Sequence, residues 1–189
     1  MRRFTGLGRG KAVLTLACAA ALAALVPTFA AGQAPPDPTV TTIDIKAGSK
    51  GLRFEAPATV VNGGQLEIVN KTSPQEFGPH TFSLVTKGSA PKTRKARKRC
   101  FAPNHICRAI GGWHKLGKIK VSEVGIEGWD TPGNLNKKGD SWFSGNKAGA
   151  SFAQQLSFDT SAGPVRAFYL CAIHPEMKGS INVLPPPVP

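Results

Sequence analysis

The sequence predicts an all-β protein, a two-sheet antiparallel Greek-key sandwich that carries a long basic loop insertion. Gly (21) and Pro (16) make up about a fifth of the 189 residues, which disfavours a helical bundle. About eight short β-branched or alternating segments are separated by turn signals, as in sandwich folds. A hydrophobic content of 41% suits one domain with an ordinary core.

The first 34 residues have the pattern of an export signal and its processing region. Basic residues precede an apolar run at 12–26, which ends at Pro27 and is followed by small residues. A run of 15 residues is shorter than the roughly 20 that a membrane-spanning helix needs, which disfavours an uncleaved anchor. We expect export to the periplasm, cell envelope or extracellular space, with residues 35–38 as a linker.

The folded domain is expected to cover residues 39–184. An Asn-Gly-Gly turn at 62–64 separates two of its early strands. Residues 185–189 are proline-rich and form a tail, because proline cannot join the middle of a sheet. The expected strands cover residues 39–45, 59–61, 65–70, 80–85, 118–121, 150–158, 166–170 and 180–184.

The formal charge of +13 is concentrated in one part of the chain. Without the signal, 20 Lys and Arg face 11 Asp and Glu. Eleven of those basic residues and no acidic residue lie between Glu76 and Glu123, mostly in an insertion at about 87–148, and the remainder has a net charge of −2. Because this segment lacks aromatic stacking residues at 92–99 and the chain is exported, we expect no nucleic-acid partner.

The densest basic run is a candidate docking patch for an acidic redox partner or for an anionic membrane surface. A merely solvated charged loop is an equal alternative. The tryptophans in the second part of the insertion predict a small satellite core rather than disorder. We expect a monomer. The patch consists of Lys92, Arg94, Lys95, Arg97, Lys98 and Arg99.

The cysteine count predicts one disulfide and one free thiol. Cys18 leaves with the signal, so three cysteines remain. Cys100 and Cys107 lie in one loop-like segment, and an exported protein meets an oxidising environment, so we expect them to form a disulfide. Cys171 is then unpaired.

Cys171 lies in a segment with soft metal ligands. The spacing Cys-x2-His-x2-Met places His174 and Met177 close behind it, and Met177 is the only methionine outside the signal. Two histidines and one cysteine with a long axial methionine form the ligand set of blue-copper sites. The alternative is an inert buried thiol beside a surface histidine.

A second histidine ligand must come from elsewhere in the chain. His80 is the best candidate, because it follows a turn signal and opens a strand-like run. His105 and His114 lie in the basic, disulfide-bearing segment, where a ligand would be poorly held.

These segments resemble the cupredoxins, the small type 1 copper proteins, and the ligand spacing is similar to that of the amicyanins; the plastocyanins have a longer His-to-Met spacing. The resemblance covers roughly residues 40–86 and 149–184. It implies one copper ion with His80, Cys171 and His174 as equatorial ligands and Met177 as the axial ligand. It also implies that His174 is the electron port.

The chain departs from the family pattern in two respects. Many cupredoxins have Asn after the first histidine, whereas Thr81 stands here. The family pattern therefore does not specify the hydrogen bonds around the ligands of this chain. From His80 to Cys171 is 91 positions, more than a small cupredoxin needs. With Thr81, we expect Pro79 and Pro175 to lie next to the ligands.

The resemblance implies an exported carrier that exchanges single electrons with redox partners through Cu(II)/Cu(I). The alternative is a copper-binding module for scavenging or delivery. An enzyme is not expected, because copper enzymes of this superfamily need further copper centres with His-x-His or Cys-His pairs, and Thr81-Phe82 and Ala172 stand at those places.

Overall fold

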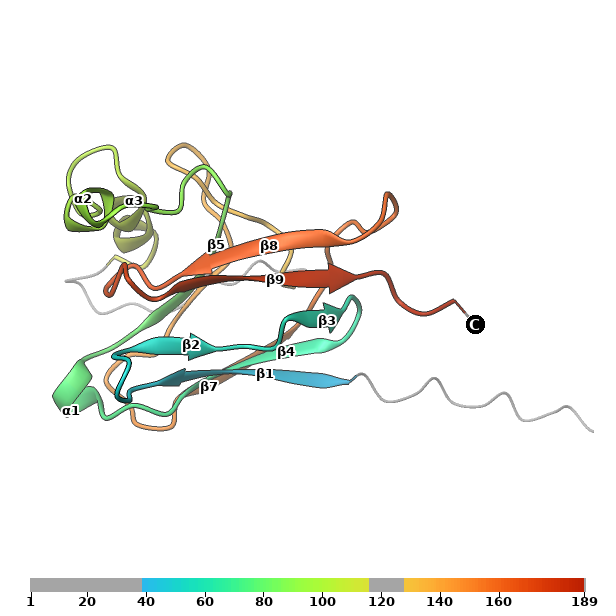
Figure 1. Ribbon diagram of the computed structural model, residues 1–189, viewed down its shortest axis with the longest axis horizontal. Coiled ribbons are helices and arrows are strands. Elements are labelled where there is room, and N and C mark those ends of the chain that lie inside the picture. The colour runs from blue at the N-terminus through green and yellow to red at the C-terminus, as the bar shows by residue number, and fades with distance from the viewer. Residues whose placement is uncertain (1–38, 116–127, 189) are drawn as a thin grey trace, which may run out of the picture. The chain divides into compact units, whose positions relative to one another are not determined.

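The computed structural model describes residues 39–115 and 128–188, which form two stacked β-sheets (Figure 1). The all-β two-sheet class is confirmed. The predicted signal at 1–34, the linker at 35–38 and the expected strand at 118–121 lie outside the described residues. Within the described part of the chain, no helix is long and apolar enough to cross a membrane. The tail at 185–188 is exposed and joins no strand.

The first sheet has four strands in the order β2-β1-β4-β7. Side chains alternate along its central strands, so that Ile43 and Ile45 of β1 and Leu66 and Ile68 of β4 are buried in the core between the sheets. The strands are β1 (Val40–Lys46), β2 (Arg53–Glu55), β4 (Gln65–Asn70) and β7 (Ser151–Gln155).

The second sheet has five strands in the order β3-β9-β8-β5-β6. Every residue of β5 is buried, because both faces of the sheet are covered at this strand. The strands are β3 (Thr59–Val61), β5 (Thr81–Val85), β6 (Ser141–Phe143), β8 (Val165–Leu170) and β9 (Lys178–Leu184).

The expectation of purely antiparallel sheets was wrong, because β1 pairs with β4 and β3 pairs with β9 in parallel. The reason is that the chain changes sheets between β2 and β3, which point the same way in Figure 1 and are separated only by residues 56–58. β2 is antiparallel to β1, and the turn at Gly63, which has φ 86°, reverses the chain after β3. β4 therefore returns parallel to β1.

The basic segment is helical rather than the expected loop. Helix α2 (Arg94–Lys98) starts where the Thr93 hydroxyl accepts a hydrogen bond from the Ala96 amide at 3.1 Å. Helix α3 (Ile106–Trp113) buries Ile106, Cys107 and Ile110 on one face. The predicted disulfide between Cys100 and Cys107 is present and joins the turn after α2 to α3.

The predicted satellite core forms, but it is built on the sandwich itself. The apolar face of α3 and the disulfide pack against Val85, Leu170 and Ala172 at the second sheet. The later part of the insertion belongs to the sandwich, since β6 extends the second sheet and Trp129 lies in the main core. This packing holds α2 and α3 beside the end of the second sheet where β8 turns into β9 (Figure 1).

Candidate metal centre

Strand register brings two distant parts of the chain together at one end of the sandwich. β5 and β8 are antiparallel neighbours with Ser83 opposite Leu170, so the start of β5 lies beside the end of β8. His80 directly precedes β5, and Cys171 directly follows β8. His174 lies in the loop that joins β8 to β9.

The three predicted equatorial ligands form a compact triangle. The Nδ1 atoms of His80 and His174 are 3.2 Å apart, and the Cys171 Sγ lies 4.0 Å and 3.8 Å from them, respectively. A metal about 2.0 Å from nitrogen and about 2.3 Å from sulfur, in a trigonal arrangement, needs separations of roughly 3.5 Å between nitrogens and roughly 3.7 Å between nitrogen and sulfur. Both the donor set and the spacing thus fit a soft ion such as copper.

Two backbone hydrogen bonds hold residues 171–177, here called the ligand loop, in a tight turn. The Cys171 amide donates to the Met177 carbonyl at 2.9 Å, and the Met177 amide donates to the His174 carbonyl at 2.8 Å. The Met177 side chain is 1% exposed and packs in the main core with Cys171. Its role as axial ligand stays a prediction.

The orientation of the His80 ring is fixed by Thr72, a residue that the sequence analysis missed. The Thr72 hydroxyl donates to the Asn70 Oδ1 at 2.7 Å, so its oxygen accepts the hydrogen bond from the His80 Nε2 at 2.9 Å. The His80 proton is therefore on Nε2, and the Nδ1 lone pair faces Cys171. The signal in the sequence was a strand that ends in Asn and is followed two residues later by Thr.

The backbone of His80 is held from both directions by Ser144, which follows β6. The His80 amide donates to the Ser144 Oγ at 2.9 Å, and the Ser144 amide donates to the His80 carbonyl at 2.9 Å. The short helix α1 (Pro74–Phe77) and the turn at Gly78, with φ 71°, lead the chain into this position. The His80 ligand is thus supported by its side chain and its main chain.

Thr81 makes the hydrogen bonds to the cysteine segment that the sequence had left open. Its amide donates to the Cys171 Sγ at 3.3 Å, and its hydroxyl accepts from the Ala172 amide at 2.8 Å. Thr81 thus connects the start of β5 to the cysteine segment through two hydrogen bonds.

Burial keeps the two histidines and the cysteine of the triangle uncharged at pH 7. Burial, assisted by repulsion from His174, lowers the pKa of His80 to about 4. Burial also lowers the pKa of His174, although Glu176 acts in the opposite direction. Both rings are neutral at pH 7 and offer a lone pair. Burial raises the pKa of the Cys171 thiol, so metal binding displaces a proton from it.

A buried chain of polar side chains leads from this site to α3. The Ser83 hydroxyl donates to the Thr81 Oγ1 at 3.3 Å and shares a hydrogen bond of 2.5 Å with the Ser141 hydroxyl. The His114 Nε2 lies 2.6 Å from the Ser141 Oγ. His114 is thus buried outside the triangle, and it is held in place there rather than in the loosely held segment expected from the sequence.

The other predicted site residues take different positions. His105 is at the surface, where its Nδ1 lies 2.9 Å from the Pro103 carbonyl oxygen, outside the triangle. Pro79 and Pro175 are half-buried next to the two histidines in the chain. Pro175 also lines a surface hollow together with three of the predicted patch residues, Arg94, Arg97 and Lys98.

Comparison with solved structures finds a similar fold in auracyanin B. That protein is 12% identical to this chain, with a TM-score of 0.38, and the similarity covers 77% of this chain and 88% of the auracyanin chain. No protein-family model matches the sequence, and no curated protein matches it.

Proposed function

We propose that this chain is a cupredoxin, a type 1 copper protein, and that it carries single electrons between redox partners in an exported location. The observation that carries the proposal is the triangle of His80, Cys171 and His174, whose ligand atoms all lie within 4.8 Å of one another. Copper, when bound, supplies a one-electron Cu(II)/Cu(I) couple. We further propose Met177 as its axial ligand.

The support around the ligands favours a carrier. Thr72 orients His80, Thr81 binds the cysteine loop, and the His174 carbonyl is tied to the Met177 amide. Ligands held in place by buried hydrogen bonds move little when the charge of the metal changes, which keeps the activation barrier to electron exchange low.

The exposure of the ligands favours electron exchange over metal transfer. His80 and Cys171 are completely buried, so an acceptor protein has no direct access to them. His174 is half-buried, so part of this residue reaches the surface. We therefore propose His174 as the point of electron entry and exit, and we assign the chain no catalytic step.

Reversible redox cycling tests the carrier proposal against copper delivery. Copper-loaded protein is reduced with ascorbate, reoxidised with ferricyanide and desalted after each step, and its copper content is measured. We expect about one copper per chain in both states and full return of the visible absorption. Release of copper upon reduction would instead identify a delivery protein.

A further inference from the structure

The basic residues of helix α2 form no ion pair among the described residues, although Glu176 lines the same surface hollow as three of them. Arg94, Lys95 and Lys98 are exposed, and Arg97 is half-buried. Lys46 pairs with Asp44 and Glu55, and Lys71 pairs with Asp44, and none of these ion pairs reaches α2. Such a cluster of like charges generates a positive field over the neighbouring surface.

The helix stands directly beside the proposed metal centre. Arg94, Arg97 and Lys98 share a hollow of about 300 Å³ with Pro175 and Glu176 of the ligand loop. Pro175 is the residue after His174, so the positive charges border the proposed electron port.

The placement of α2 is fixed by a contact to the sheet. The Lys178 Nζ at the start of β9 donates to the carbonyl of Pro91, just before the helix.

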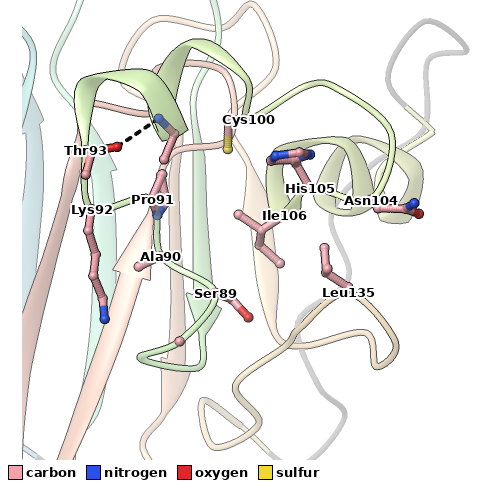
Figure 2. A pocket seen from close by; sticks show the side chains of 12 residues that line it. Ser89, Ala90, Pro91, Lys92, Thr93, Cys100, Asn104, His105, Ile106 and Leu135 are labelled. Carbon is pink, nitrogen blue, oxygen red and sulfur yellow. Dashed lines mark hydrogen bonds between the residues drawn. The ribbon is translucent and has the colours of Figure 1, made fainter.

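A second hollow, of about 380 Å³, is lined by Thr93 and Ala96 at the start of α2 and is shown in Figure 2. Ile106 and Leu135 provide apolar walls, and Lys92 lies at the start of the helix beside it. Leu135 is 48% exposed. Apolar hollows next to charged residues are typical of protein interfaces, where an apolar anchor adds to long-range electrostatic attraction.

We propose that α2, the two hollows beside it and residues 174–176 form the docking surface for a redox protein with an acidic surface. This inference rests on the proposed function. Charge complementarity identifies the partner, because the unpaired charges of α2 attract carboxylates and steer them to the surface next to His174. Two hollows beside one helix suit the protruding side chains of a protein better than they suit a flat lipid surface.

Stopped-flow electron transfer to two c-type cytochromes, one acidic and one basic, tests this surface. Reversal of two charges in Arg94→Glu/Lys98→Glu is expected to slow the reaction with the acidic cytochrome about 10-fold or more at low ionic strength. The same variant is expected to react faster than the parent with the basic cytochrome. The difference is expected to vanish at about 0.5 M salt, where the Debye length is about 4 Å.

The matched control is Lys50→Glu/Lys147→Glu, which changes the net charge equally at exposed turns that line neither hollow. We expect this control to stay within about 2-fold of the parent rate. Equal slowing by both double variants would overturn the docking surface. So would tight binding to vesicles of three parts phosphatidylcholine and one part phosphatidylglycerol with no cytochrome selectivity.

The visible absorption of each copper-loaded variant separates the two proposals. If the absorption is normal and the rates are unselective, the docking surface is wrong and the copper site stands. If the parent protein shows no copper-thiolate absorption, the proposed function itself fails.

Discussion

Replacing Trp129 with alanine is expected to lower the free energy of unfolding by about 3–5 kcal/mol. The side chain is completely buried, although it belongs to the segment that the sequence assigned to an insertion. Its ring packs edge-on against Phe82 at 5.2 Å and Phe152 at 6.0 Å between centroids, and so contacts both sheets. Truncation leaves a large cavity at the centre of the domain.

Urea unfolding of the metal-free protein measures this effect, with Leu135→Ala as the control from the same segment. Leu135 is 48% exposed, so its truncation is expected to change the free energy of unfolding by less than about 0.5 kcal/mol. A loss below about 1 kcal/mol for Trp129→Ala would mean that the segment around it folds apart from the sandwich.

Replacing Thr72 with valine is expected to weaken metal binding by about 10- to 100-fold. Valine preserves the shape of the side chain but removes the oxygen that accepts from the His80 Nε2 at 2.9 Å. The His80 proton then lacks its buried partner, and the tautomer that directs Nδ1 toward Cys171 is no longer favoured. The same change leaves buried polar groups unpaired, at a cost of about 1–3 kcal/mol in folding free energy.

Competition for Cu(I) with a chromophoric chelator measures this affinity. Ser73→Ala is the control, because the Ser73 hydroxyl bonds only to the Gln75 Oε1 at the surface among its described hydrogen bonds. We expect the control to bind copper as the parent does. An affinity of Thr72→Val within about 2-fold of the parent, in a folded protein, would contradict the assigned role of Thr72.

The local part of the candidate site could be predicted from the sequence. Cys171, His174 and Met177 are close in the chain, so their spacing alone indicates a shared site. His80 could be added because a histidine at a strand start is held by that strand. Thr72 was missed because its role depends on the direction of two hydrogen bonds, which no spacing records.

The parts of the fold that depend on residues close together in the sequence could be predicted. The alternation of β1 and β4 and the turn at Gly63 indicate strands, but the parallel pairing of β1 with β4 depends on a change of sheet at residues 56–58. The cap at Thr93 was present in the sequence, yet the charge run around it suggested a solvated loop. The burial of Trp129 depends on tertiary contacts with Phe82 and Phe152.

The visible and EPR spectra of the protein loaded with Cu(II) test the central claim most directly. We predict an intense thiolate-to-copper absorption in the parent protein, its loss in Cys171→Ala, and its retention in His105→Ala, since His105 lies outside the triangle. A parent protein without this absorption, or its survival in Cys171→Ala, would contradict the assignment of a type 1 copper site.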